Sequence, residues 1–558
     1  MARMKATSPS NRHSQSILAF GICSRIKKMK TSLRMFRPWQ ILNSITIEHL
    51  WALTVLVGIF VFVNTHPIRP HDFWWHMAVG REILETGQIP QVDMFSQTMR
   101  GAPYPSYQAF WLMEAAMYGV YRLGGAALTV LLHGVVITAA YALLLWLGRR
   151  VSGSWRAAAA GTLFAAALGL NDWNVRPQAI TFAIAALFLL AIHEYRQTQR
   201  RAWLVVFPLG MVLWVNSHGT FPQGLALMAF WVADEGWKAL QSGDITWTSL
   251  RQALQTPLLT LALSLGACAL SPRGLGTFAY VSGMTSDPII QNLVPEWAPP
   301  TFDTLGGQLF FGGLLLSAAI LALSPKRPTP SQLLTFLAFG GLGIRTSRGS
   351  IWFGLVMAPV LAEHVARLGE EIRKRKGEKA EKRESEKAGR REGEKADLQN
   401  QKSKIENVLN LALVGLLLWG AVLSLPWFKA LWPLAPEKRG LISAETPIAA
   451  TEFLLQERLP GPLFHAMSFG SYLIWAAQPE YPVFVDGRIE LYPADLWLDY
   501  LHISAAAPGW EATLEKYGIQ TLMLSPQEQA GLVAAVETSP GWVERYRDEV
   551  SVVFIRAE

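Results

Sequence analysis

The sequence predicts a mainly α-helical membrane protein. We expect a polytopic transmembrane bundle of about 11 spans, with the N-terminus inside and the C-terminus outside, and a C-terminal extracytoplasmic α/β domain. Composition is the first reason: 51% of the 558 residues are hydrophobic and only 16% are charged, whereas soluble domains carry about 25% charged residues. The other two reasons are a series of long apolar segments and the placement of positive charge between them.

Apolar segments of membrane-spanning length recur along the chain. A bilayer core about 30 Å thick needs roughly 20 mostly apolar helical residues, or fewer within a bundle. No small-residue cleavage site follows the first segment, so we expect a retained anchor and not a removed signal peptide. The predicted spans lie near residues 47–64, 126–147, 157–170, 178–194, 202–216, 219–236, 255–271, 308–323, 331–345, 349–366 and 406–425.

The basic residues set the predicted orientation. The formal net charge is +8, and Lys and Arg collect in alternate connections, which the positive-inside rule places in the cytoplasm. Short clusters of this kind mark topology and not a nucleic-acid surface, so we expect membrane lipids and no nucleic acid among the partners. The clusters are Arg25 to Lys28, Arg149-Arg150, Arg196 with Arg200-Arg201, Lys238 with Arg251, Lys326-Arg327 and the charged run 367–404.

This topology divides the chain into regions. After the last span, strand-length apolar runs alternate with helical patterns, which is typical of a small α/β domain, long enough here to bury its own core. The predicted regions are a basic cytoplasmic tail (1–46), a transmembrane domain (47–366) with outer loops 65–125 and 271–307, a charged cytoplasmic linker (367–405), a last transmembrane helix (406–425) and the extracytoplasmic domain (440–558).

Unusual polar motifs collect on the predicted outer side. The densest is His71-Asp72-Phe73-Trp74-Trp75-His76, directly after the first span. Ionisable groups at membrane depth are costly, so their collection indicates a functional site. Carboxylate and imidazole groups bind divalent cations or act as bases, and arginine binds phosphate oxygens through a rigid fork of donors. These residue types favour transfer of a group from a lipid-linked phosphate at the outer membrane face.

The same residues carry a family resemblance. Asp72 to His76, followed by Gly87 to Pro90 and Asp93 to Ser96, resembles the first loop of bacterial GT-C-type membrane glycosyltransferases. It looks closer still to their poorly characterised dolichyl-phosphate-mannose-transferase-like relatives. The resemblance covers most of the chain except the N-terminal tail and the charged linker. Other motifs similar to that group are Arg176-Pro177-Gln178, Trp214 with Asn216 to Gly219, Glu296-Trp297, Gly470 to Leu473 and Val485 to Arg488.

The resemblance implies a multi-pass enzyme of the bacterial inner (plasma) membrane. Such an enzyme transfers a hexosyl or pentosyl group, with inversion, from a polyprenyl-phosphate donor to a glycan, lipid or protein acceptor of the cell envelope. An acidic residue of the first outer loop then acts as base or metal ligand, and Asp72 is the matching position. Phe73 replaces a second acid that is common there, so metal dependence stays open.

The site hypothesis therefore assigns three sets of residues. Asp72 and His76 are four positions apart, and on a helix they would share one face. The assigned sets are Asp72, His76 and Asp93 as catalytic residues; Arg176, His218, Arg345, Arg348 and Trp75 as substrate-binding residues; and Asp72, His76 and Glu296 as ligands of a Mg or Mn ion.

Several of these residues also have a structural interpretation. Asp72 is placed to cap a helix, and Asp93 is placed to cap a turn. Trp74 and Trp75 are more typical of interfacial anchors than of sugar platforms. Asp486-Gly487 is a strong turn signal.

Two other functions stay open from the sequence. A transporter or flippase needs polar residues along a path through the bundle or paired broken helices. A non-catalytic envelope-assembly protein needs only the fold. The polar groups gather at one face and no internal repeat is evident, which favours the transferase.

Overall fold

Residues 45–243, 246–384, 395–432 and 434–557 are described by a computed structural model. Within those limits, residues 48–384 and 414–557 belong to one compact unit, which contains the C-terminal sheet and the charged residues of the candidate site. Residues 45–47 and 395–413 belong to a second unit, where the Asn410 side chain donates a hydrogen bond to the Ile45 carbonyl oxygen at 3.0 Å. Most of the predicted N-terminal tail, and 385–394 of the predicted charged linker, lie outside the described residues.

The described chain is mainly helical, and every predicted span overlaps a helix. Among the described residues, seven helices are long and apolar enough to cross a membrane, and Arg201–Val215 is a shorter apolar segment. The count of eleven spans and their direction stay predictions. The helices are α3 (Ile47–Thr65), α5 (Ser106–Ser152), α6 (Trp155–Gly169), α7 (Ala179–Thr198), α8 (Val206–Val215), α9 (Phe221–Gln241), α10 (Trp247–Ala267), α13 (Leu305–Leu323), α14 (Pro330–Arg345), α15 (Gly349–Glu384) and α16 (Lys395–Leu423).

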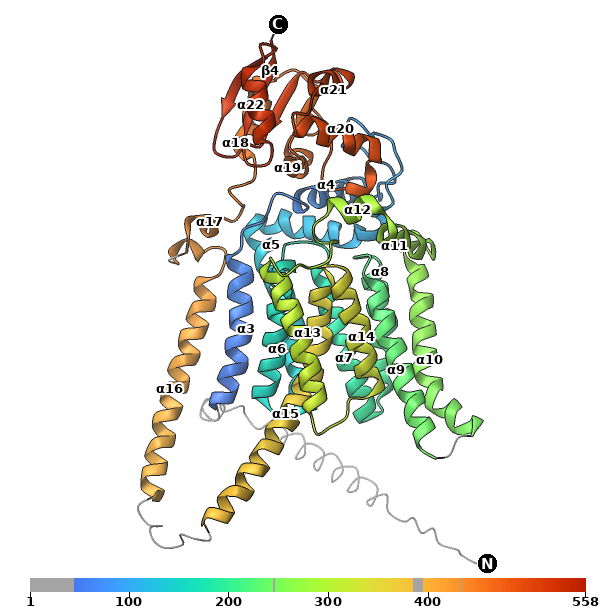
Figure 1. Ribbon diagram of the computed structural model, residues 1–558, viewed down its shortest axis with the longest axis vertical. Helices are drawn as coiled ribbons and strands as arrows, with labels where there is room; N and C mark the ends of the chain where they lie inside the picture. The colour runs from blue at the N-terminus through green and yellow to red at the C-terminus, as the bar shows by residue number, and fades with distance from the viewer. Residues whose placement is uncertain (1–44, 244–245, 385–394, 433, 558) are drawn as a thin grey trace, which may run out of the picture. The chain divides into compact units, whose positions relative to one another are not determined.

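Local sequence accounts for where some of these helices begin and bend. Thr329 and Gln332 form a capping box at the start of α14, and Pro330 occupies its first turn, where a missing N–H costs nothing. Helix α5 is interrupted at Gly124 and Gly125, and Gly125 adopts a positive φ of 61° that glycine tolerates best. The segment of α5 before this break lies across one end of the bundle (Figure 1).

Short helices occupy the two long predicted outer loops. Helix α4 (Phe73–Thr86) lies in the first loop, and α11 (Gly276–Ser286) and α12 (Pro288–Leu293) lie in the second. Figure 1 shows α4 and α12 at the same end of the bundle as the first segment of α5. Helix α4 agrees with the four-residue spacing of Asp72 and His76, whereas α11 and α12 are additions to the predicted fold.

Ion pairs join several of the predicted inner segments at the other end of the bundle. Arg150 at the end of α5 pairs with Glu194 of α7 at 2.8 Å. Arg196 of α7 pairs with Asp234 of α9 at 2.6 Å, and Lys326 pairs with Glu363 of α15. The segments that the positive-inside rule grouped together therefore meet in space.

The C-terminal region contains a small mixed sheet flanked by helices, as the α/β pattern predicted. Strand order is β1-β2-β4-β3, with β1 parallel to β2 and the other pairs antiparallel. The elements are α17 (Pro436–Arg439), α18 (Ile448–Glu457), β1 (Leu463–His465), α19 (Met467–Ala476), α20 (Ala494–Ser504), α21 (Trp510–Lys516), β2 (Thr521–Leu524), α22 (Ala530–Thr538), β3 (Trp542–Arg547) and β4 (Val552–Arg556).

This sheet region shares its hydrophobic core with the first outer loop. One buried cluster includes Trp75, Val79 and Phe95 together with Phe464 and Phe469. The prediction that residues 440–558 bury a core of their own is therefore incomplete, because the first outer loop supplies part of it.

The structure also corrects the interpretation of Trp74 and Trp75 as interfacial anchors. Their exposed fractions are only 1% and 4%. The Trp74 ring packs edge-on against Tyr472 of α19 at 5.2 Å between centroids. The Trp75 backbone N–H donates to the Ser471 hydroxyl at 3.0 Å. Both rings fill the interface between α4 and α19, because that contact removes more apolar surface from water than a headgroup layer does.

A fully buried arginine, Arg488, connects the first outer loop to the C-terminal region. Arg488 donates to both carboxylate oxygens of Asp486, from Nε at 2.9 Å and from Nη2 at 2.6 Å. Its Nη1 also pairs with Asp93 and donates to the Tyr107 hydroxyl at 2.6 Å. Asp93 in turn accepts from the backbone N–H of Ser96 at 3.0 Å, as a turn-capping aspartate does. One guanidinium therefore joins the first outer loop, α5 and the C-terminal region.

We expect Arg488→Met to lower the free energy of unfolding by about 3–5 kcal/mol, because it leaves two buried carboxylates without their counter-charge. Thermal unfolding of the detergent-purified protein, followed by tryptophan fluorescence, measures the change. Arg545→Met is the matched control, since Arg545 is 40% exposed and its pair with Glu457 spans 3.7 Å; it should change stability by less than about 1 kcal/mol. Equal melting temperatures for the two variants would contradict this account.

Candidate active site

A chain of alternating charges lies where four of the predicted outer segments meet. Arg176 Nε lies 3.0 Å from Asp72 Oδ2, and Arg176 Nη1 lies 2.8 Å from Glu296 Oε1. Arg348 Nη2 continues the chain to Glu296 Oε2 at 2.6 Å. These residues come from the start of α4, the segment before α7, the segment before α13 and the α14–α15 connection. Three of them were predicted to bind substrate or to act in catalysis, and Glu296 was a predicted metal ligand.

The backbone fixes this chain of charges. The Arg348 N–H donates to the Glu296 carbonyl at 3.0 Å, and the Ser347 N–H donates to the Ala298 carbonyl at 2.9 Å. Asp72 occupies the N-cap position of α4, but its side chain caps no backbone N–H. The carboxylate is therefore directed to Arg176, and the helix-cap interpretation of Asp72 is wrong.

The surroundings shift the pKa values of two carboxyl groups at this site in opposite directions. Burial opposes ionisation of Glu296, but Arg348 and Arg176 outweigh it and lower the pKa of Glu296 to about 2. Burial and the charge of Glu296 raise the pKa of Asp172 to about 7, against the partial compensation of Arg348 and Arg176. Asp172 lies in the same outer segment as Arg176, in the short helix η1 (Leu170–Asp172).

Two histidines, His76 and His218, lie close to this chain, and both are neutral. His76 is buried and its Nδ1 lies 2.8 Å from Glu114 Oε1 of α5. Burial, with the charge of Arg176, holds the pKa of His76 well below its usual range. Burial and the charge of Arg348 lower the pKa of His218 to about 3. Both rings pack against Phe110, at 5.5 and 5.3 Å between centroids.

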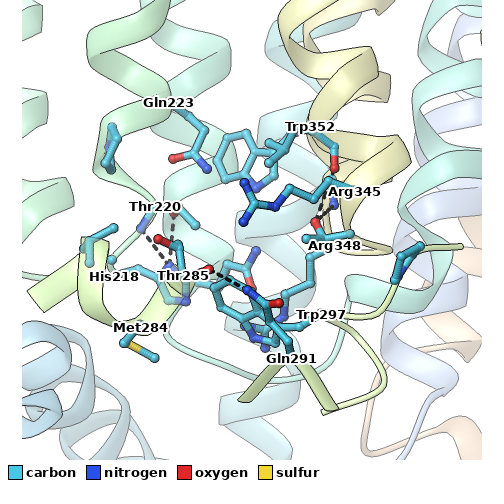
Figure 2. A pocket seen from close by; sticks show the side chains of 18 of the residues that line it. His218, Thr220, Gln223, Met284, Thr285, Gln291, Trp297, Arg345, Arg348 and Trp352 are labelled. Atoms are coloured by element: carbon cyan, nitrogen blue, oxygen red, sulfur yellow. Dashed lines mark hydrogen bonds between the residues drawn. The ribbon is translucent and has the colours of Figure 1, made fainter. Parts of the chain in front are cut away.

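A cavity of about 600 Å³ opens beside Arg348. Figure 2 shows Arg345 and Arg348 on one side of it, with His218, Thr220 and Gln223 opposite. Arg345 is exposed, and among the described residues no carboxylate pairs with its guanidinium. Apolar side chains form much of the remaining wall: Phe110, Val281, Met284, Trp297, Leu342 and Trp352.

A second cavity, of about 550 Å³, is lined by Glu296 and Arg348, and Arg348 lines both cavities. Polar atoms form a larger share of its wall than of the wall of the first cavity. Its polar residues are His66, Arg69, Asn171, Asp172, Asn174, Glu296, Thr304, Ser347, Arg348 and Ser350. A small pocket beside it contains Asp72 and Arg176 and shares Arg69 and Asn174 with it. Arg348 of the charged chain thus borders both a cavity with a largely apolar wall and a more polar one.

The remaining predicted residues lie outside this charged chain. Asp93 is committed to the buried contact with Arg488, and Trp75 is buried between α4 and α19. His76 stands behind the chain against Glu114. Sequence reasoning did not assign a role to Asp172 or Glu114. Asp172 lies in a loop that was predicted to face outward with the other polar motifs, so it could have been identified. Glu114 lies in an apolar segment and belongs to none of those motifs.

The predicted Mg or Mn site does not fit this arrangement. Asp72 and Glu296 both face Arg176, and His76 is directed to Glu114. In the described part of the chain, no group of three or more His, Cys, Asp or Glu side chains is placed to hold a metal ion.

The raised pKa of Asp172 predicts a pH effect on stability. The folded protein holds a proton between about pH 4 and 7 that the unfolded chain releases, so this carboxyl lowers stability as pH rises through that window. Asp172→Asn removes the effect. We expect the melting temperature of the variant, relative to the unaltered protein, to be a few degrees higher at pH 8 than at pH 5. Asp303→Asn, at an exposed position, should show the same difference at both pH values; a constant difference for Asp172→Asn would contradict the assignment.

Comparison with known proteins places this fold. No family profile and no curated protein matches the sequence. The cryo-EM structure of arabinofuranosyltransferase AftD from Mycobacteria matches over 91% of this chain and 40% of that chain, with a TM-score of 0.50 and 12% identity. ArnT from Cupriavidus metallidurans bound to undecaprenyl phosphate matches over 90% and 97%, with a TM-score of 0.49 and 14% identity.

The archaeal oligosaccharyltransferase AglB from Archaeoglobus fulgidus, in complex with an inhibitory peptide and a dolichol-phosphate, matches over 91% of this chain and 74% of that chain. Its TM-score is 0.49, with 12% identity. At such identities a structural similarity shows the fold alone. Of these three matches, AftD has the TM-score of 0.50, and the assignment of the fold rests on it. The chain has the fold of the GT-C-type polytopic glycosyltransferases, which confirms the resemblance recognised in the sequence at the level of the fold.

Proposed function

We propose that this protein is an integral membrane glycosyltransferase. It transfers a hexosyl or pentosyl group from a polyprenyl-phosphate donor to a glycan, lipid or protein acceptor at the extracytoplasmic face of the bacterial inner membrane. The observation that carries the proposal is a surplus of positive charge at the cavity that Arg345 and Arg348 line. The fold shared with AftD, an arabinofuranosyltransferase, supports the same conclusion.

The positive and negative side chains of the site do not balance, and one anionic ligand would supply the missing negative charge. Arg176 and Arg348 are balanced by the carboxylates of Asp72 and Glu296. Asp172, with a pKa of about 7, contributes less than one full negative charge near neutral pH. Arg345 therefore adds an uncompensated cation. A guanidinium directed into a cavity with an apolar wall suits a phosphate attached to a polyprenyl chain.

Asp72 is the group best placed to accept a proton. Among the described residues it pairs with Arg176 alone, whereas Glu296 is engaged by two arginines. In the proposed reaction an acceptor hydroxyl oxygen attacks the anomeric carbon and its proton passes to Asp72. The bond from that carbon to the phosphate oxygen breaks, and its electron pair leaves on the polyprenyl phosphate. Arg345 and Arg348 stabilise that leaving group, and attack from the opposite face gives inversion.

The second cavity supplies a place for the acceptor. Its amide and hydroxyl side chains are suited to hydrogen bonds with a polyol, and it adjoins the pocket that contains Asp72. Arg348, which lines both cavities, lies where donor and acceptor meet. His76 keeps its structural contact with Glu114 and serves to position α4.

Asp72→Asn should lower the transfer rate at least about 100-fold, because the amide cannot accept the hydroxyl proton. The assay supplies the purified protein with a panel of polyprenyl-phosphate sugars and an envelope extract, and measures the release of polyprenyl phosphate. This product is the same for every acceptor. Asp303→Asn, a change at an exposed position of the predicted 271–307 loop, is the control and should retain full activity. Unchanged release by Asp72→Asn would remove Asp72 as the base, and no release by the unaltered protein would refute the enzymatic proposal.

Arg345→Gln should raise the KM for the donor about 10- to 100-fold with a smaller change in kcat, since a charge-assisted contact to phosphate contributes roughly 1.5–3 kcal/mol. Donor titrations in the same assay measure both constants. Arg100→Gln alters another exposed arginine that lies outside the cavity lining and should leave them unchanged. A donor KM that does not respond to Arg345→Gln would place the phosphate elsewhere.

A further inference from the structure

A turn of the C-terminal region lies directly against the Asp72 carboxylate. The turn is Asp486-Gly487-Arg488, between Val485 and helix η5 (Ile489–Leu491). A Cβ atom added at Gly487 would come within 2.9 Å of Asp72 Oδ1, closer than real Cβ contacts allow. The same atom would be 4.0 Å from Trp75 Nε1. More than 400 positions of sequence thus separate Asp72 from the turn that lies against its carboxylate.

The glycine is required by space and not by backbone conformation. Gly487 is not among the glycines with a positive φ, so an L-residue can adopt its backbone angles. There is no room for the Cβ atom of an L-residue, because the Asp72 carboxylate lies too close to it. The contact therefore constrains Asp72 from the side that faces the C-terminal region.

The turn itself has no room to retreat. Behind it, a Cβ atom at Gly470 of α19 would come within 2.6 Å of the Asp486 Cβ and 2.7 Å of the Val485 carbonyl oxygen. Asp486 also accepts the Arg488 backbone N–H at 2.9 Å, within the buried contact to Asp93. Packing and charge together hold the turn in place.

Asp72 is held from its other side by Arg176, which pairs with Oδ2 at 3.0 Å while Oδ1 faces Gly487. The carboxylate is therefore clamped between a cation of the helical bundle and a backbone surface of the C-terminal region. A shift of either wall moves the carboxylate. Catalytic groups displaced by about 1 Å lose up to 100-fold in rate.

We propose that Gly487 is a positioning residue for Asp72, so that the C-terminal region completes the active site. The inference rests on the proposed function, because it assigns Asp72 the role of base. It predicts that a methyl group at position 487 displaces the carboxylate without changing any residue that binds the donor. The defect should appear in kcat and not in KM.

The first test compares Gly487→Ala with Gly531→Ala in the polyprenyl phosphate release assay. Gly487→Ala should lower kcat about 10- to 100-fold and change the donor KM less than about threefold. Gly531 is an exposed position of α22, where a Cβ would meet only the Ala505 carbonyl oxygen at 4.0 Å, so Gly531→Ala should keep both constants. Full activity of Gly487→Ala, with Asp72→Asn inactive, would overturn the inference alone. Full activity of Asp72→Asn would overturn the assignment of Asp72 as base and this inference with it, whereas no activity of the unaltered protein would overturn the proposed function.

The second test needs no activity. Gly487→Ala should lower the melting temperature by about 3–6 °C when Asp72 is present, because the added methyl overpacks the contact. In an Asp72→Ala background the same change should cost at most about 1 °C, since the opposing carboxylate is gone. A variant too unstable to purify as Gly487→Ala should be recovered as the double variant. Equal losses in both backgrounds, or no recovery, would overturn the inference.

Discussion

The contact that the rest of the site depends on is the double engagement of Arg176 by Asp72 and Glu296. Two carboxylates that lie more than 220 positions apart in the sequence meet on one guanidinium, and Arg348 extends the chain from Glu296. Because burial makes an unpaired charge expensive, each member of this chain requires the others. The ends of the helices that were predicted to face outward therefore meet at one place, and Arg348 borders two cavities there.

A second buried arginine connects this site to the C-terminal region. Arg488 joins Asp93 of the first outer loop to Asp486 of the turn that faces Asp72. The apolar core continues through the same interface, from α4 to α19. Through this arrangement the C-terminal sheet region reaches the reacting group directly. Two guanidiniums, Arg176 and Arg488, thus fix the two surfaces that hold the Asp72 carboxylate.

The sequence predicts the helices and most of the residues of the site, but not which of these residues contact one another. Apolar length predicts the spanning helices because burial in a bilayer requires it, and charge asymmetry predicts that Asp72, Arg176 and Arg348 share one end. The contacts of Asp93 with Arg488, and of Asp72 with Gly487, join segments about 400 positions apart. Nothing in the local pattern distinguishes a turn-capping Asp93 from one that also neutralises a buried arginine. The same limit applies to Trp74, whose local pattern fits a headgroup anchor and whose ring is buried against α19.

The central claim is that the cavity lined by Arg345 and Arg348 holds a lipid phosphate beside the Asp72 chain. A cryo-EM structure of the purified protein with polyprenyl monophosphate, the product proposed to be released, tests it most directly. The account predicts phosphate density within hydrogen-bond distance of both guanidiniums, with the polyprenyl chain along the wall that contains Leu342 and Trp352. Phosphate bound at another place, or no binding at saturating lipid, would contradict it.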